Sequence, residues 1–235
     1  MNFRLFPANE RGHADYGWLK TYYSFSFANW YNPHLIHFGM LRVLNDDTIA
    51  PHSGFDFHPH KDMEIITIML EGELTHEDSM GNKGTIQQNE VQVMSAGSGI
   101  FHSEKNSSDS IVKLFQIWIF PDQKNLTPRY EQMKYELKNN ELIYLVTPFN
   151  EPIGLHIHQN AYISRILLEQ GKSFDYSLHH SDNGLYLMCI NGQVEITQQL
   201  LNNRDAIGIW DTNKKITFQT QNILSDLLLI EVPMH

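Results

Sequence analysis

The fold of this chain is decided by the stretch Gly54-Phe55-Asp56-Phe57-His58-Pro59-His60-Lys61-Asp62-Met63-Glu64 and by a later partner, Gly97-Ser98-Gly99-Ile100-Phe101-His102-Ser103-Glu104. The first stretch carries a His-x-His pair, and the second carries a His-x-Glu pair. Side chains at positions i and i+2 of a strand point to the same face. Two such strands facing each other would direct His58, His60, His102 and Glu104 toward one point.

Three imidazoles and one carboxylate form a ligand set that suits a divalent first-row metal such as iron, with coordination positions left for a substrate or dioxygen. The alternative is that these side chains only alternate outward on exposed strands. Two pairs, each beside glycines and framed by apolar runs, favour metal binding over that alternative. The residues themselves do not choose among Fe, Mn, Co, Ni, Cu and Zn.

Short apolar runs separated by turn residues make up most of the remaining chain. This texture predicts an all-β sandwich or barrel. We expect one strand at Leu41–Leu44 to end at the polar run Asn45–Asp47, and three further strands at Ile65–Leu70, Glu90–Met94 and Ile111–Phe120. Thr127 and Pro128 suit the start of a short helix or turn that runs to Met133, inside a connector at about residues 121–141.

The second half of the chain repeats the pattern of the first half. The matching segments are Ile68–Leu74 with Met188–Val194, Asn89–Val91 with Arg204–Ala206, and Val112–Pro121 with Ser225–Pro233. We therefore predict two tandem β units, residues 1–125 with the metal site and residues 126–235 with the connector and a unit without metal.

The histidines of the second half do not repeat the pattern of the first half. No histidine lies between Ser181 and Met234. His179 and His180 are adjacent, so on a strand they would face opposite ways. His156 and His158 have chelating spacing, but a second pair is missing from the same half, and a half-exposed strand is the favoured interpretation.

Composition excludes several classes of protein. The chain has 235 residues, 41% of them hydrophobic, and a formal net charge of −10, so a packed core is expected and nonspecific nucleic-acid binding is not. The single cysteine, Cys189, lies in an apolar run and is expected to be a buried side chain. The N-terminus has no signal-peptide core, and no apolar run is long enough for a membrane helix. We expect a soluble cytoplasmic monomer.

Five motifs carry a resemblance to the pirin family of the cupin superfamily, including bacterial members described as quercetin 2,3-dioxygenases. The motifs are Ser24–Phe27, Leu41–Asp47, His58–Glu64, Leu70–Ser79 and Met94–Glu104. The resemblance covers nearly the whole chain and implies a bicupin, in which two β-sandwich barrels follow each other and the first holds the metal. One departure is Asn89, where the family usually has glycine; asparagine also tolerates positive φ.

The resemblance also implies the ligands and the activity. The ligands carried over are His58, His60, His102 and Glu104, and the metal implied is Fe(II), one ion per chain. In many other cupins the carboxylate ligand lies four residues after the second histidine, which is Glu64 here, so we interpret Glu64 as a buried acid beside the site and keep it as the alternative ligand.

The activity implied is dioxygen-dependent cleavage of a flavonol such as quercetin at the 2,3-bond with release of carbon monoxide, with Glu104 as a base for the 3-hydroxyl. The alternative function is an iron-dependent, redox-sensing co-regulator of transcription that acts through protein partners. The same ligand set permits both functions, because fold and metal alone do not determine function.

Overall fold

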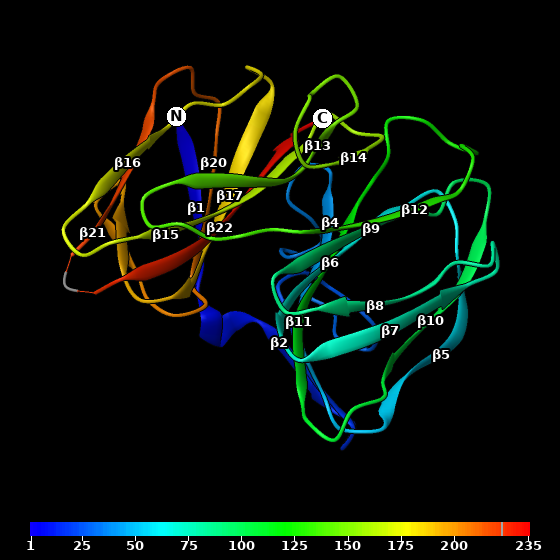
Figure 1. The fold of residues 1–235 in the computed structure, drawn as a ribbon. Helices are drawn as coiled ribbons and strands as arrows, with labels where there is room; N and C mark the ends of the chain where they lie inside the picture. Colours follow the sequence, from blue (N-terminus) through cyan, green and yellow to red (C-terminus); the bar gives the residue numbers. More distant parts are fainter. Residues whose placement is uncertain (222) are drawn as a thin grey trace.

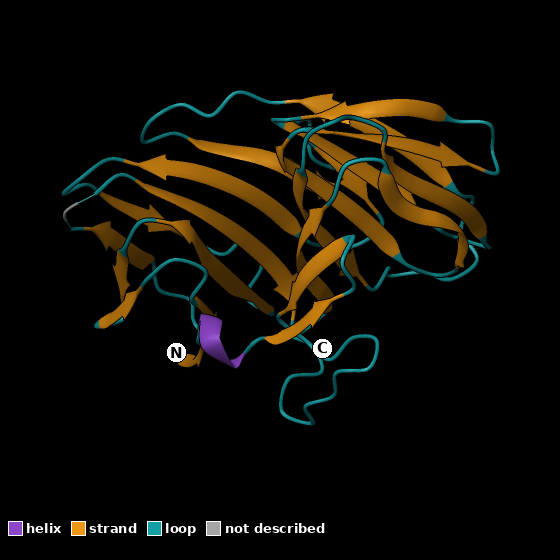
Figure 2. Cartoon of the chain, turned by 90° about the horizontal axis from the view of Figure 1, so that it is seen from below, coloured by secondary structure: helices purple, strands orange, loops and turns teal. Residues whose placement is uncertain are grey.

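The computed structural model describes residues 1–221 and 223–235, and almost all of its ordered structure is β-strand (Figures 1 and 2). The only helical element among these residues is a short 3-10 turn at Ala8–Glu10, drawn in purple in Figure 2. The strands of the first half are β1 (Asn2–Phe6), β2 (Gly12–Asp15), β3 (Leu19–Tyr23), β4 (Leu41–Ile49), β5 (Ser53–His60), β6 (Glu64–Glu71), β7 (Glu73–Asp78), β8 (Lys83–Gln87), β9 (Glu90–Ser95), β10 (Ile100–Asn106) and β11 (Val112–Ile119). The later strands are β12 (Arg129–Lys134), β13 (Leu142–Pro148), β14 (Leu155–Ile157), β15 (Tyr162–Leu168), β16 (Ser173–Tyr176), β17 (Asn183–Asn191), β18 (Val194–Ile196), β19 (Gln199–Leu201), β20 (Ala206–Trp210), β21 (Ile216–Thr220) and β22 (Ser225–Pro233).

The strands form two units, and each unit contains one seven-stranded sheet and one four-stranded sheet. The first unit has the orders β12-β9-β6-β11-β4-β3-β2 and β5-β10-β7-β8. The second unit has the orders β1-β20-β17-β22-β15-β13-β14 and β16-β21-β18-β19. Figure 1 shows the two units side by side, with β5, β7 and β10 at the far end of the first unit. The predicted all-β architecture of two tandem barrels is confirmed.

The apolar side chains explain why the sheets pair in this way. In the first unit Met69 and Leu114 of the large sheet pack with Leu74 and Ile86 of the small sheet, and a similar cluster fills the second unit. A third cluster contains residues from the opposite faces of both large sheets, among them Phe115 and Tyr186. The two large sheets therefore pack back to back, and each encloses its own barrel interior against a small sheet.

The predicted internal repeat is visible in the strand order. Strands β9, β6, β11 and β4 occupy the same relative places in the first large sheet as β20, β17, β22 and β15 occupy in the second. The turns that enter β9 and β20 also match, because Asn89 and Arg204 both have positive φ, 62° and 68°. Asn89 thus adopts the left-handed conformation that the family usually assigns to glycine.

The two units exchange an edge strand. Strand β1 pairs with β20 of the second unit, and β12 pairs with β9 of the first unit. An ion pair also links the units, since Asp46 of β4 accepts a hydrogen bond from Arg204 Nε at 2.7 Å. The division at residues 1–125 and 126–235 stays a prediction, with these two strands lying across it.

Two local predictions were wrong. Strand β4 does not end at Leu44 but continues through Asn45–Asp47 to Ile49, because those polar residues pair with β3 and β11 inside the sheet. The segment after Pro128 is not helical; it forms β12, which completes the edge of the large sheet beside β9. In both places a polar composition suggested an interruption where pairing with a neighbouring strand satisfies the backbone.

Cys189 is fully buried, as predicted, and burial raises the pKa of its thiol to about 12. None of the helical structure found in the described residues is long and apolar enough to cross a membrane.

Candidate metal centre

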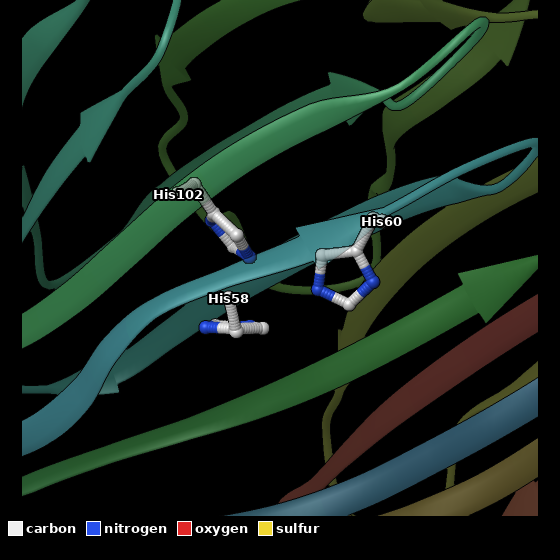
Figure 3. A group of neighbouring side chains, drawn as sticks. All are labelled: His58, His60 and His102. Atoms are coloured by element: carbon white, nitrogen blue, oxygen red, sulfur yellow. The ribbon is translucent and has the colours of Figure 1, made fainter.

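The two predicted histidine strands are neighbours. Strands β5 and β10 pair antiparallel, with His58 directly opposite His102 and His60 opposite Ile100. Residues that are directly opposite each other in a ladder project from the same face. His58, His60 and His102 therefore share one face of the small sheet, and Figure 3 shows their rings converging.

A β-bulge in β5 adjusts this face. The register runs from the His102–His58 pair to the Glu104–Phe55 pair, so β5 uses one more residue than β10 over this step. The extra residue places Phe55 on the same face as His58, although the two are three positions apart. Phe57 is left on the outer face, where its side chain is 53% exposed.

The three histidines have the geometry of a metal-binding group. Each offers one ring nitrogen, and these three atoms lie within 4.8 Å of one another. The ring centroids of His58 and His102 are 4.5 Å apart, and those of His60 and His102 are 5.0 Å apart. The backbone oxygen of Asp56 lies 2.7 Å from Nδ1 of His58, which holds that ring and leaves Nε2 for a ligand bond.

The electrostatics of two of the rings, those of His60 and His102, also fit a metal. Burial, and then the neighbouring His58, lower the pKa of His60 to about 4 and the pKa of His102 to about 2. Neutral imidazole is the form that binds metals, so these rings are ready to do so at neutral pH. His102 is 1% exposed, and neither of its ring nitrogens has a hydrogen-bond partner. A divalent cation would satisfy this otherwise orphaned group.

Glu104 faces the same cavity but lies outside the group formed by the three histidines. Its carboxylate accepts hydrogen bonds from Gln116 Nε2 at 3.0 Å and from Thr67 Oγ1 at 3.3 Å. The side chain is 2% exposed, and burial raises the pKa of Glu104 above its ordinary value. The structure thus places Glu104 beside the histidines as an acid held by two strands of the large sheet.

Glu64 lies elsewhere. The chain turns after His60 at Lys61–Met63, so Glu64 begins β6 of the large sheet. Although it lies four residues after His60, it does not share the strand of the histidines. Its carboxylate accepts a hydrogen bond from Ser95 Oγ at 2.6 Å. Burial raises the pKa of Glu64 to about 7. It does not line the cavity of the histidines.

This cavity lies between the two sheets of the first unit and has an empty volume of about 600 Å³, part of it open to solvent. The small sheet contributes the three histidines, Glu104 and Phe55 to its lining. The large sheet and the segment after β3 contribute Leu19, Thr21, Tyr23, Phe27, Asn45, Asp47, Gln116 and Trp118. Ligand sites commonly have this mixture of aromatic side chains with a few polar ones.

Sequence reasoning missed the large-sheet side of the cavity. Asn45 and Asp47 were taken for turn residues, and Gln116 and Trp118 for part of an apolar run. One signal was available: Asn45 and Asp47 are two positions apart, so on a continued strand both would face inward, as they do.

The histidines of the second half are engaged otherwise. His179 Nδ1 lies 2.8 Å from the fully buried carboxylate of Glu231, and His179 Nε2 lies 3.1 Å from the Tyr144 hydroxyl. His156 and His158 lie against Phe149, with the ring of His158 4.5 Å from it. Across residues 1–221 and 223–235, the only group of three or more potential ligands is the one at His58, His60 and His102.

Comparison with known proteins agrees with this two-unit structure. The Pirin family model matches residues 5–119, and the model of the quercetinase C-terminal cupin domain matches residues 144–232. A quercetin 2,3-dioxygenase of Escherichia coli strain K12 is 41% identical over 232 residues, which cover 97% of this chain and 98% of the relative. A pirin-like protein of Caulobacter vibrioides is 41% identical over 87% of this chain and 89% of its own.

Solved structures give the same result. The crystal structure of YhhW from Escherichia coli superposes with a TM-score of 0.94 at 39% identity, covering 99% of this chain and 98% of that one. Bacterial pirin YhhW in complex with nickel(II) superposes with a TM-score of 0.93 at 38% identity, covering 99% of both chains. Since its relatives match along almost their full length, this chain belongs to the pirin family of the cupin superfamily.

Proposed function

We propose that this chain is a metal-dependent dioxygenase that cleaves a flavonol such as quercetin at the 2,3-bond and releases carbon monoxide. The metal ligands in this proposal are His58, His60, His102 and Glu104. The observation that carries it is the placement of three converging imidazoles in the wall of a cavity of about 600 Å³ with aromatic sides. The relatives named quercetin 2,3-dioxygenase support the same activity.

The residues of the chain have separate tasks in this reaction. The three histidines would hold one divalent metal, which when bound supplies Lewis-acid chemistry and activates dioxygen. Phe27, Phe55 and Trp118 would pack against the flat rings of the substrate and exclude water.

Glu104 would accept the proton of the 3-hydroxyl. Burial keeps its proton affinity high, and Gln116 and Thr67 hold its carboxylate in place. A base of raised pKa that is buried beside the substrate is suited to proton transfer near neutral pH. Glu104 can be both a metal ligand and a base, because a carboxylate oxygen can exchange its bond to the metal for a bond to a proton.

The divalent metal is assigned to iron in this proposal, because the reaction consumes dioxygen. The nickel(II) complex of YhhW supports a divalent ion in this family without selecting iron. Imidazole and carboxylate ligands also accept Mn, Co, Cu and Zn, and supply in the cell decides among such metals.

The alternative, an iron-dependent co-regulator that acts through a protein partner, is less well supported. A redox-sensing metal needs no room for an organic ligand. The cavity beside His60 has an aromatic lining and an opening, and these features are required only if a substrate enters.

The test is an assay of carbon monoxide release and loss of flavonol absorbance in air, with protein loaded in turn with Fe(II), Mn(II), Co(II) and Ni(II). The proposal expects turnover with at least one metal and none in the metal-free protein. Absence of turnover with every metal and a panel of flavonols would favour the co-regulator.

A further inference from the structure

The large sheet of the first unit carries a polar row on the face that lines the barrel interior. The pairing register places one polar residue of each of five adjacent strands side by side. The row consists of Tyr23 of β3, Asn45 of β4, Gln116 of β11, Thr67 of β6 and Gln92 of β9. The neighbouring row toward one end is apolar, with Val43, Trp118 and Ile65 aligned. A barrel interior is normally packed with apolar side chains, so this row requires an explanation.

Two of the five residues in the row are explained by Glu104. Gln116 and Thr67 donate to its carboxylate. The next pair on the same face of β3 and β4 is also polar, because Thr21 lies directly opposite Asp47. We call Thr21, Asn45 and Asp47 the acceptor wall. All three line the cavity, on the sheet that faces the histidines.

The acceptor wall is buried but has unpaired polar atoms. Thr21, Asn45 and Asp47 are 1%, 4% and 3% exposed. Thr21 Oγ1, Asn45 Oδ1 and Asp47 Oδ1 have no partner at full hydrogen-bond geometry, although the Thr21 hydroxyl is near enough to Asp47 to lower the pKa of that carboxyl. Buried polar atoms without partners are rare, and each one destabilises the folded state. A valine in place of Thr21 would have the same shape and would avoid this cost. Because these atoms line the cavity, they are available to bind a molecule that enters it.

The chemistry of these atoms selects the kind of group that binds. A carboxyl oxygen and an amide oxygen accept hydrogen bonds, and a threonine hydroxyl can do so. Burial raises the pKa of Asp47 to about 7, and in either protonation state one of its oxygens remains an acceptor. A hydroxyl group supplies the missing donor. An ionised carboxylate or phosphate has no hydrogen to donate to these acceptors.

The space between the two walls is aromatic. Trp118 packs edge-on against Phe27 at 5.3 Å and against His60 at 4.9 Å, and Phe55 completes the lining beside His58. Aromatic side chains such as these pack favourably against a flat ring. A flat ligand bound at the histidines through one edge would present its other edge to the acceptor wall.

We propose that Thr21, Asn45 and Asp47 bind a hydroxyl of the substrate on the side of the cavity that faces the metal centre. This inference rests on the proposed function and narrows its substrate class. The substrate is an aromatic compound with a phenolic hydroxyl at the edge remote from its metal-binding oxygens. Asp47 accepts a hydrogen bond from that hydroxyl and so determines which substrates bind. It takes no part in the reaction itself.

The test compares two ligands that share the metal-binding edge. Quercetin and 3-hydroxyflavone both have the 3-hydroxyl and the 4-carbonyl, but 3-hydroxyflavone lacks the other hydroxyls. Binding is measured by calorimetry without dioxygen, in nickel(II)-loaded and in metal-free protein. We expect the protein to bind quercetin about tenfold more tightly in both forms, the effect of one well-made hydrogen bond.

Asp47→Leu and Thr21→Val should each reduce this preference several-fold while leaving the affinity for 3-hydroxyflavone unchanged. Thr48→Val is the matched control, because Thr48 belongs to the same strand but is absent from the cavity lining. Thermal unfolding and nickel content establish that each variant is folded. If Asp47→Leu does not fold, Thr21→Val alone provides the comparison.

The inference is overturned if the unaltered protein shows no preference, if both variants keep it, or if neither ligand binds. Its failure can be told apart from failure of the proposed function. Preferential binding without carbon monoxide release would refute the dioxygenase and leave the acceptor wall in place. Turnover of both ligands with equal affinity would refute the acceptor wall alone.

Discussion

His58 and His102 lie directly opposite each other on β5 and β10, with their ring centroids 4.5 Å apart. This relationship links two segments that are more than forty positions apart in the sequence, and it depends on the backbone pairing of the small sheet. The site is consequently as rigid as the ladder that carries it, which is the condition for a preorganised metal centre.

The first prediction concerns stoichiometry. Among the residues that the structure describes, three converging imidazoles are found only in the first unit, so protein reconstituted with metal should hold one ion per chain. Replacing His58 and His60 by Ala should abolish tight binding, measured by elemental analysis after dialysis. Replacing His156 and His158 by Gln is the control and should leave the metal content unchanged. Two tightly held ions per chain would contradict the assignment.

A second prediction concerns Gly54, whose φ is 155°. A Cβ atom added at Gly54 would lie only 2.2 Å from the backbone oxygen of Glu104. Gly54→Ala should push β5 from β10, lower the unfolding temperature and reduce metal content. Gly81 is the matched control, since it also has positive φ, 91°, but no atom within 4 Å of its Cβ position. Gly81→Ala should cost only about 1 kcal/mol from backbone strain.

If Gly54→Ala and Gly81→Ala destabilise the protein equally, the close approach of β5 to Glu104 has no energetic consequence. Unchanged metal content in Gly54→Ala would separate the β5–β10 pairing from the metal centre.

The third prediction concerns Glu64. Burial raises its pKa from 4.5 to about 7, so the folded state binds this proton more tightly than the unfolded state. The free energy of unfolding should therefore fall as the pH rises from about 4.5 through 7, by about 3 kcal/mol for this group. Glu64→Gln removes the titrating group and should flatten this part of the pH profile.

Urea unfolding of the metal-free protein at several pH values between 4.5 and 8 provides the comparison. Glu73→Gln is the matched control, because Glu73 is an exposed side chain at the start of β7. Identical pH profiles for the unaltered protein and Glu64→Gln would show that Glu64 titrates normally in the folded state.

The strand texture and the internal repeat could be predicted from the sequence because both rest on local periodicity. The convergence of His58, His60 and His102 was predicted for the same reason, since i and i+2 spacing fixes their common face. The structure also shows which side chains the second unit has in place of converging histidines. Strands β16 and β21 correspond to β5 and β10 in sheet order, and they contribute Phe174, Tyr176 and Phe218 to the apolar core of the second unit.

Three features were beyond local periodicity. The bulge in β5 brings Phe55 to the face of His58, and only the pairing with β10 reveals it. Polar Asn45–Asp47 continue β4 because a cavity, and not solvent, lies on their inner side. Glu64 leaves the face of the histidines because the chain turns before it, with Asp62 at a φ of 50°. Each depends on contacts between distant segments that composition does not encode.

The most direct test of the proposed dioxygenase is the carbon monoxide released from quercetin in air by metal-loaded Glu104→Gln, compared with the unaltered protein. Glutamine keeps the shape of the side chain but loses its basicity, while the three histidines remain to hold metal. The account predicts a loss of turnover of about 10²- to 10⁴-fold, as is typical when a general base is removed, with measurable metal still bound. Equal carbon monoxide release by both proteins at equal metal content would contradict it.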